Sequence, residues 1–285
     1  MAAIKMEDCL VIGFIQTVVE EDIAWPKPPP YQFSAESEER VWGEIKKGFI
    51  NLLGGDERPQ LIVIPELSVP HGHEYDLRLM AASANAVVIA GMDFFYSKEG
   101  KVCNKAIVIV PDRWPNVSYS KGASQFYFGK TFYSAAEEDM FEKANLISQP
   151  DIYILDAGSY GKLGVAICSD FFDIERFVVY KGRIQHLIII AHNRDTESYY
   201  FLAEAIARLV YCNVIICNTG EFGDSIAFSP FKDAYKRIIY RHKGKGLFST
   251  QVVSVPVKAL DNEQKDDEPN VEFKSRPPGY KKLRF

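Results

Sequence analysis

The chain contains short, continuous runs of apolar and β-branched residues, and helical patterns lie between several of them. Because these runs do not alternate with polar residues, we predict strands that are covered on both faces. The predicted strands are 10–15, 61–65, 86–92, 105–110, 152–155, 163–168, 187–191, 213–217 and 252–257. Strands that alternate with helices indicate an α/β fold built in layers.

The clearest helical pattern covers residues 37–55, which carry one apolar stripe. Ser37 is the expected N-cap, because its hydroxyl can accept a hydrogen bond from an N–H of the first turn. Gly54 and Gly55 form the expected C-terminal stop. Further helices are predicted at 74–85, 173–185 and 199–212.

The composition is that of an ordinary globular protein, since 47% of the residues are apolar and 25% are charged. The net charge of -5 gives no support for a nucleic-acid or membrane surface, and no apolar run is long enough to span a bilayer. The five cysteines form no CxxC pair, and the N-terminus lacks the pattern of a signal peptide. We therefore predict a reducing, cytoplasmic setting.

The C-terminal region differs in character from the rest of the chain. We predict one domain over residues 1–260 and an extended charged tail over 261–285. The tail is acidic at 261–270 and basic at 274–285. Three arrangements are compatible with this composition: packing on the body, packing on a partner subunit, or a flexible arm.

Two residues that can do chemistry stand at the ends of predicted strands, and a third lies between them in an aromatic context. Glu66 follows the strand LIVIP, Cys168 ends the strand LGVAIC, and Lys130 lies between them in YFGKTFYS. In layered α/β folds, functional groups gather where strands end. A carboxylate can take a thiol proton, and an ammonium group can stabilise a thiolate and a developing oxyanion.

Each of the three residues also has an ordinary structural explanation. Cys168 can be a small buried apolar residue, Glu66 a helix cap or solvated turn residue, and Lys130 a surface lysine. The catalytic hypothesis therefore depends on all three residues occurring together, in this order.

The segments LIVIPELSVP, YFGKTFYS and LGVAICSDFFD, in that order, resemble the nitrilase superfamily of carbon–nitrogen hydrolases. The resemblance covers most of the chain and includes Asn104 before one strand, and Arg208, Asn218, Gly223 and Ser225 near another. It implies an α/β fold, a four-layer α-β-β-α sandwich. It also implies dimers or larger homo-oligomers, which would associate through the helices at 173–185 and 199–212.

The resemblance further implies the roles of individual residues. Cys168 would be the nucleophile, Glu66 the general base, and Lys130 the group that stabilises the tetrahedral intermediate. Glu137 would be a second glutamate, with Glu138 as the alternative. The backbone N–H of Ser169 would complete the oxyanion site. This scheme needs no metal or organic cofactor. A small-molecule amide would pass through a thioester on the cysteine, and a nitrile through a thioimidate.

Three features depart from the family pattern. The segment KTFYSAAEED lacks the His and Leu that often follow the family's lysine. Ser169 stands where a tyrosine is common, and the segment AHNRDTESYY (191–200) is polar where many members have a small-residue loop. Its residues His192, Asn193, Arg194 and Asp195 either line the substrate pocket and select a polar or anionic substrate, or form a hydrogen-bonded loop beside the site.

Two other classes of function compete with this reading. A metal-dependent hydrolase would use the cluster Glu66, His71, His73, Glu74 and Asp76. A non-catalytic relative would bind a small molecule or act as a regulatory subunit. The presence of all three triad residue types argues against a simple loss of the site.

Overall fold

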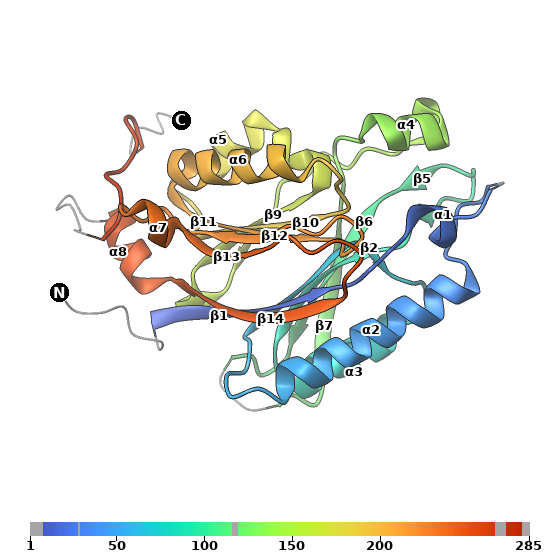
Figure 1. The fold of residues 1–285 in the computed structure, drawn as a ribbon, viewed down its shortest axis with the longest axis horizontal. Helices are drawn as coiled ribbons and strands as arrows, with labels where there is room; N and C mark the ends of the chain where they lie inside the picture. Colours follow the sequence, from blue (N-terminus) through green and yellow to red (C-terminus); the bar gives the residue numbers. More distant parts are fainter. Residues whose placement is uncertain (1–7, 28, 116–118, 266–271, 281–285) are drawn as a thin grey trace.

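The computed structural model describes residues 8–27, 29–115, 119–265 and 272–280. In this part of the chain, two six-stranded sheets stack on each other, and a small pair, β4 (Phe95–Tyr96) and β5 (Val102–Cys103), lies apart from them. Helices cover the two outer faces (Figure 1), so the layers run α-β-β-α. The α/β sandwich expected from the sequence is confirmed.

The first sheet combines a parallel centre with antiparallel edges. Its strands, in order, are β14 (Ser249–Pro256), β1 (Cys9–Gln16), β2 (Leu61–Val69), β3 (Val87–Met92), β6 (Lys105–Pro111) and β7 (Ala123–Gly129). Strands β1, β2 and β3 are parallel, and the other pairings are antiparallel. Helices α2 (Ala35–Leu53) and α3 (Glu74–Ala84) contact the outer face of this sheet.

The second sheet has the same plan. Its strands, in order, are β13 (Ile238–His242), β12 (Ser225–Phe228), β11 (Asn213–Asn218), β10 (His186–Ala191), β9 (Lys162–Ile167) and β8 (Ile154–Asp156). Strands β9, β10 and β11 are parallel. Helices α5 (Ile174–Tyr180) and α6 (Thr196–Ile206) lie over its outer face (Figure 1), and a π-helical turn, η5 (Ala207–Tyr211), continues α6.

The inner faces of the two sheets form one apolar core. Strand β2 contacts β10 and β11, and Val63, Ile89, Val165 and Ile189 belong to one buried cluster. Every position of β1, β2, β10 and β11 is buried. The prediction of strands covered on both faces is therefore confirmed for these central strands, whereas the strand predicted at 152–155 corresponds to β8, which begins at Ile154 and is partly exposed.

The structure shifts several predicted helix boundaries. Helix α2 is capped by Ser34, whose Oγ accepts a hydrogen bond from the N–H of Ser37 at 3.2 Å. The prediction of Ser37 as the N-cap was wrong, because the extended backbone of Ser34 starts the helix one turn earlier. Helix α5 is shorter than the predicted 173–185, since the chain turns at Gly182, where φ is +75°.

Several strands were absent from the sequence prediction: β4, β5, β7, β12 and β13. Strand β7 is buried only at its last two positions, and β13 is partly exposed throughout. Their sequences therefore lack the continuous apolar runs by which the central strands were recognised.

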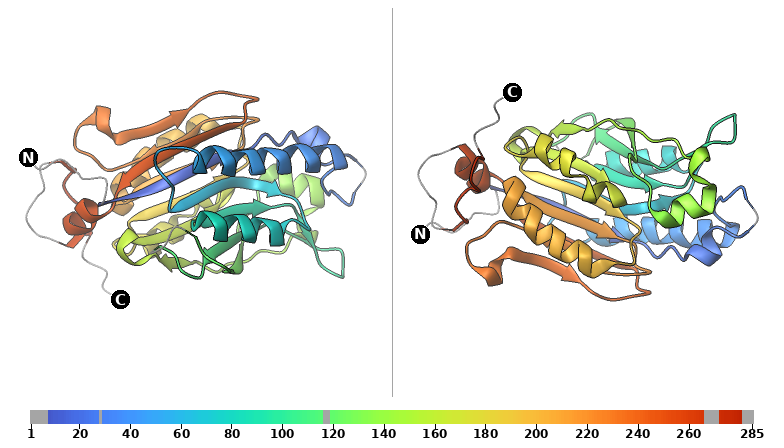
Figure 2. Two further views of the ribbon diagram at one scale, coloured as in Figure 1. Left: turned by 90° about the horizontal axis from the view of Figure 1, so that it is seen from below. Right: turned by 90° about the horizontal axis from the view of Figure 1, so that it is seen from above.

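The C-terminal part packs on the body wherever it is described. Helix α8 (Lys258–Lys265) crosses the predicted boundary at residue 260. Phe273 stacks on Phe231 at a centroid distance of 4.9 Å, and Tyr280 contacts Tyr211 at 5.5 Å. Figure 2 shows this part at the end of the sandwich opposite α1 (Glu21–Ala24) and α4 (Ala135–Phe141). The segments 266–271 and 281–285 of the predicted tail lie outside the described residues.

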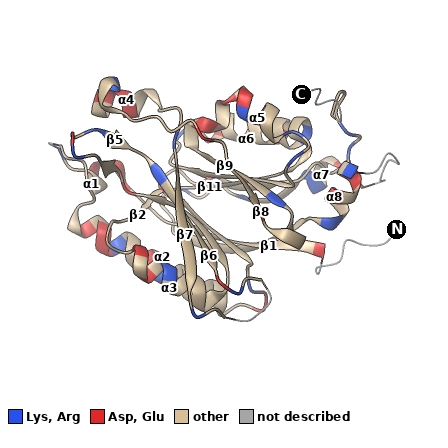
Figure 3. Cartoon of the chain, turned by 180° about the vertical axis from the view of Figure 1, so that it is seen from behind, with Lys and Arg blue, Asp and Glu red and all other residues tan. Residues whose placement is uncertain are grey.

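Charged side chains concentrate on helices and loops, and both signs are mixed there, whereas the sheets carry mostly other residues (Figure 3). None of the helices in the described residues combines the length and apolar character that a membrane span requires. The cytoplasmic location stays a prediction.

Candidate active site

Glu66 lies in an irregular part of β2. The pairing of β2 with β3 shifts register between Ile64 and Val69, and Leu67 has φ +54°. The backbone of β3 passes close to this bulge, because a Cβ atom on Gly91 would lie 2.3 Å from the Glu66 Cα. Gly91 therefore allows the bulge that takes Glu66 out of the regular ladder.

Lys130 directly follows β7, and the antiparallel partner strand β6 fixes its position. The Lys130 N–H donates to the carbonyl of Asn104 at 2.9 Å, and the Lys130 carbonyl accepts from the N–H of Gln149 at 3.0 Å. Asn104 immediately precedes β6. The end of the β6–β7 ladder thus delivers both an ammonium group and an amide to the same place.

Cys168 is the first residue of a short 3₁₀ helix, η4 (Cys168–Phe172), that follows β9 directly. Its φ is +45°, in the left-handed region that non-glycine residues rarely adopt. Such strain persists where the surroundings hold it in place, and it is often found at functional sites. The turn presents the sulfur beyond the end of the strand while leaving the residue only 6% exposed.

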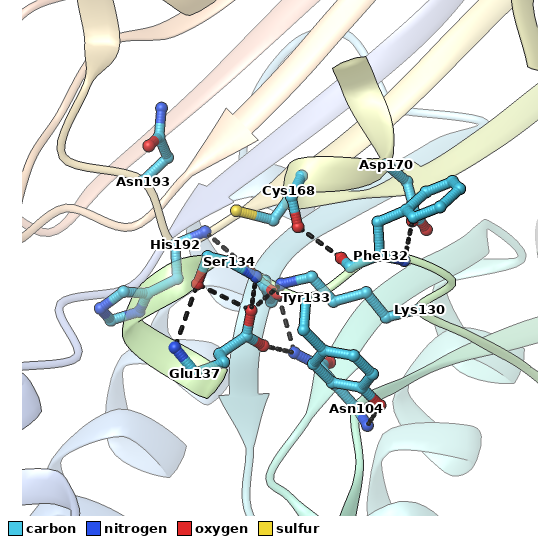
Figure 4. A network of polar contacts seen from close by, with 12 residues as sticks. Asn104, Lys130, Phe132, Tyr133, Ser134, Glu137, Cys168, Asp170, His192 and Asn193 are labelled. Carbon is cyan, nitrogen blue, oxygen red and sulfur yellow. Dashed lines mark hydrogen bonds and ion pairs between the residues drawn. The ribbon is translucent and has the colours of Figure 1, made fainter. Parts of the chain in front are cut away.

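Glu66, Lys130, Asn104 and Glu137 form one buried polar network. Figure 4 shows Lys130, Asn104 and Glu137 of this network. The Lys130 Nζ lies 2.8 Å from Glu66 Oε1 and 2.6 Å from Glu137 Oε2. The Asn104 Nδ2 donates to Glu66 Oε1 at 2.8 Å and to Glu137 Oε1 at 3.1 Å. One cation and one amide therefore bind two carboxylates.

The two candidate second glutamates differ in their surroundings. Glu137 lies in the first turn of α4, where it forms a capping box with Ser134. Its Oε2 accepts from both the N–H and the hydroxyl of Ser134 at 2.9 Å. Glu138 instead forms an ion pair with Lys143 at 2.8 Å on the surface. Glu137 is thus the glutamate that contacts Lys130.

The buried network changes the protonation of its members. Burial alone would lower the pKa of Lys130, but Glu137 and Glu66 outweigh it and hold that pKa well above its usual value. Burial would raise the pKa of Glu137, but Lys130 outweighs it and lowers that pKa. Burial, followed by the charge of Glu66, raises the pKa of the Cys168 thiol to about 12. At neutral pH the site therefore holds a thiol, an ammonium group and a carboxylate.

Asp170 ties the cysteine turn to the loop after Lys130. Its carboxylate accepts from the N–H of Thr131 at 3.0 Å and of Phe132 at 2.9 Å. Arg176 lies 3.5 Å from the same carboxylate and donates to the Thr131 hydroxyl at 3.0 Å. Ser169 adds a hydrogen bond from its hydroxyl to the Phe132 carbonyl at 2.5 Å. These contacts join the two loops.

His192 reaches the network through its main chain. Its N–H donates to Glu66 Oε2 at 2.8 Å. Its imidazole is buried and lies 3.4 Å from Glu21 and 3.5 Å from Glu221. Burial opposes protonation, but these two carboxylates outweigh it and raise the pKa of His192 to about 9. The imidazole therefore carries a positive charge at neutral pH.

Asn193 takes part in a local turn. Its Nδ2 donates to the Asp195 carbonyl at 2.9 Å, and its Oδ1 accepts from the Asp195 N–H at 3.2 Å. Figure 4 shows this side chain pointing away from Lys130 and Glu137. Of the two alternatives for this segment, a pocket lining and a hydrogen-bonded loop, these contacts fit the loop. Substrate binding by Ser169, His192 and Asn193 stays a prediction.

Sequence reasoning missed the role of Asn104 and the presence of Tyr199. Asn104 could have been found from the sequence, since it directly precedes a predicted strand. Tyr199 gave no such signal beyond its place in the polar segment after β10. Its hydroxyl lies 3.4 Å from the Cys168 Sγ and donates to it.

The histidines of the metal-site alternative point to different partners. His71 Nε2 contacts the carbonyl of Phe94 at 3.0 Å, whereas His73 Nε2 contacts Glu38 at 3.0 Å and its ring stacks on Trp42. In the described residues, no group of three or more His, Cys, Asp or Glu side chains is placed to hold a metal ion.

No protein-family model and no curated protein matches this sequence. Solved structures do match. An amidase from Nesterenkonia sp. aligns with a TM-score of 0.64 and 14% identity, over 92% of this chain and 95% of the amidase. A cysteine-to-alanine variant of the amidase from Nesterenkonia sp. AN1, in complex with butyramide, aligns with a TM-score of 0.63 and 14% identity, over 92% and 96%.

A CN-hydrolase superfamily protein from Xanthomonas campestris, which carries an arsenic adduct in its active site, aligns with a TM-score of 0.62 and 14% identity, over 90% of this chain and 94% of that one. The Nesterenkonia enzyme is described as a member of the nitrilase superfamily. The chain therefore has the fold of the nitrilase, or CN-hydrolase, superfamily, as the resemblance in sequence implied.

Proposed function

We propose that this protein hydrolyses a non-peptide carbon–nitrogen bond, with an amide as the substrate class, through Cys168, Glu66 and Lys130. One observation carries the proposal: a buried cysteine on a left-handed turn lies within the electrostatic influence of a lysine that is bound by two buried carboxylates. A purely structural ion pair would not need a strained thiol beside it.

Glu66 is the general base in this scheme, and Glu137 is a positioning residue. After burial, the charge of Glu66 is the largest influence on the thiol pKa, and that of Glu137 is smaller. Glu137 Oε2 is occupied by Lys130 and by both donors of Ser134. Because the thiol pKa is about 12, attack at neutral pH requires such a base.

The reaction then follows from the charges. As Cys168 attacks the amide carbon, its proton moves to Glu66 and the carbonyl oxygen becomes an oxyanion. The ammonium of Lys130 and the N–H of Ser169 stabilise that oxyanion. The amine or ammonia leaves with a proton from Glu66, and a thioester remains. Glu66 then activates a water molecule that releases the acid.

An amide is favoured over a nitrile by the structural neighbours. One is an amidase variant bound to butyramide, and another carries the acetamide moiety of fluoroacetamide on its active-site cysteine. In the butyramide complex alanine replaces the cysteine. Both neighbours support a small amide as the substrate class proposed here.

The test is release of ammonia or amine from a panel of small amides, carbamoyl compounds and nitriles, with Cys168→Ala measured in parallel. We expect turnover of at least one amide by the native protein and loss of that turnover in the variant. Equal turnover in both proteins would show that the thiol is not the nucleophile. Turnover only of nitriles would replace the substrate class and keep the mechanism.

We also propose that the protein is a homo-oligomer that associates through α5, α6 and η5. These elements expose the large apolar side chains of Ile174, Val178, Phe201 and Leu209, and exposed apolar side chains are often found at interfaces. Sedimentation at micromolar concentration should give a dimer or a larger species, and the variant Phe201→Glu should be smaller. A native monomer would contradict the proposal.

A further inference from the structure

The hydroxyl of Tyr199 is in direct contact with the proposed nucleophile. It lies 3.4 Å from the Cys168 Sγ, in a geometry in which the O–H donates to sulfur. Tyr199 is 4% exposed, so this hydrogen bond lies away from bulk water. A buried hydrogen bond to an atom that becomes charged has a larger effect than one in water.

The tyrosine ring is held from several sides. It contacts the rings of Phe171 and Phe172 at centroid distances of 5.3 Å and 5.6 Å. Tyr199 lies in the first turns of α6, which begins at the capping residue Asp195, whose carboxylate accepts from the Ser198 N–H at 3.3 Å. The hydroxyl is therefore directed at the sulfur by the helix and by two aromatic neighbours.

One short segment contacts both the base and the nucleophile. Residue 192 donates its N–H to Glu66 Oε2, and residue 199 donates its hydroxyl to Cys168 Sγ. This is the polar segment that departs from the family pattern. The segment therefore contacts the proposed base and the proposed nucleophile directly. These contacts give it a role in positioning catalytic groups in addition to any role in lining a pocket.

We propose that Tyr199 is a catalytic residue whose hydroxyl stabilises the Cys168 thiolate as it forms. This inference rests on the proposed function. When the carbon–sulfur bond forms, the thiol proton moves to Glu66 and the electron pair of the carbonyl moves to oxygen. Tyr199 keeps its own proton throughout and only donates a hydrogen bond.

The physical reason is a difference in acceptor strength. A thiolate is a much better acceptor than a thiol, so the hydrogen bond strengthens as negative charge develops on sulfur. An interaction that is stronger in the transition state than in the ground state increases the rate. Burial, together with the nearby Cys168, raises the pKa of Tyr199 well above its usual value, so the phenol stays a donor over the working pH range.

The experiment compares Tyr199→Phe with Tyr200→Phe. Phe keeps the ring between Phe171 and Phe172, so thermal unfolding of Tyr199→Phe should stay close to that of the native protein. Tyr200 lies one residue along the same helix, and its ring contacts Phe228 and Arg241. Both variants lose one hydroxyl, but only the first loses the contact with sulfur.

The readout is the rate of alkylation of Cys168 by iodoacetamide between pH 7 and 9, located by peptide mass mapping. We expect Tyr199→Phe to react about 10-fold more slowly at each pH, which is the ratio for loss of one hydrogen bond to a charged group. Tyr200→Phe should match the native protein. On an amide that is turned over, Tyr199→Phe should lower kcat and leave KM within about threefold.

Either of two results would overturn the inference. Equal alkylation of Tyr199→Phe and native protein would mean that the hydroxyl only packs against sulfur. Faster alkylation of the variant would mean that the thiol is the donor and the tyrosine the acceptor. Alkylation needs no substrate, so its result tests the role of Tyr199 alone. The amide panel tests the proposed function separately, so a failure of one can be told from a failure of the other.

Discussion

Two buried cysteines of the second sheet differ sharply in their surroundings. Cys168 follows β9, and Cys217 lies in β11, where it pairs with Ile190 of the strand between them. Both are free thiols, and burial raises the pKa of both. Burial therefore does not distinguish a reactive cysteine from a packed one.

The difference lies in charge and in backbone geometry. The pKa of the Cys168 thiol is influenced by Glu66, Lys130 and Glu137 in addition to burial. The Cys217 sulfur donates to the carbonyl of Val63 at 3.4 Å, inside a regular strand. A cysteine thus becomes a candidate nucleophile where the chain leaves the ladder and charged groups lie within reach.

The largest expected effect is on turnover. Cys168→Ala should lower kcat/KM for the best amide at least about 1000-fold, because the covalent route is lost. Cys217→Ala should change it less than about threefold, since its effect is confined to packing. Assays of the two variants side by side measure the contrast. Similar losses in both would mean that the two sites do not differ in function.

The next effect is on stability and concerns the charges around Cys168. Lys130→Met should lower the free energy of unfolding by about 3–5 kcal/mol, because two buried carboxylates lose their cation. Urea denaturation measures the loss. Lys143→Met is the matched control: its partner Glu138 lies on the surface, and the expected loss is at most about 1 kcal/mol. Equal losses of stability in Lys130→Met and Lys143→Met would show that the buried carboxylates do not depend on Lys130 for their stability.

The third effect is a pH dependence from His192. Its pKa in the folded protein, about 9, lies above the unfolded value of about 6.5. The stabilisation is therefore fully present below about pH 6.5 and is lost as the pH rises through about 9. For a rise in pKa from about 6.5 to about 9, the loss is about 3 kcal/mol. Denaturation measures the free energy of unfolding of the native protein and of His192→Gln at pH 6 and pH 10. The difference between these two free energies should be smaller at pH 10.

His186 is the control for this window. It is also fully buried, but burial lowers its pKa to about 3, so it stays neutral between pH 6 and pH 10. Because the unfolded state, with a pKa of about 6.5, binds the proton at pH 6 and the folded state does not, the free energy of unfolding of the native protein relative to His186→Gln should rise by about 1 kcal/mol from pH 6 to pH 10, which is the opposite direction to His192. A narrowing of the His186 difference, or a constant His192 difference, would contradict the charge states described here.

The smallest expected effect is on stability and compares two serines that cap helices. Ser134→Ala and Ser34→Ala should each cost about 1 kcal/mol of stability, because each serine accepts an N–H at the start of a helix. Only Ser134 also binds Glu137, so only Ser134→Ala should lower kcat. Thermal unfolding and turnover measure both effects. A loss of activity in Ser34→Ala would mean that helix stability in general, and not the network, limits the reaction.

Much of the fold could be predicted because burial on both faces leaves continuous apolar runs, as in β10 and β11. The edge strands β7 and β13 are partly exposed, and their mixed sequences hide them. The start of α2 was misplaced because Ser34 and Ser37 are equally good caps in sequence, and only the backbone of Ser34 decides between them.

Within the proposed site, Glu66 and Cys168 could be found in the sequence because they stand at the ends of predicted strands, whereas Lys130 follows β7, a strand that the sequence did not predict. Their contacts with distant residues could not be found in this way. The contact of Glu66 with His192 joins residues 126 positions apart, and that of Cys168 with Tyr199 joins residues 31 positions apart. A local pattern determines whether a segment is buried and where it turns. Which distant donor meets a given atom depends on how the two sheets and their loops pack, and no local pattern encodes that.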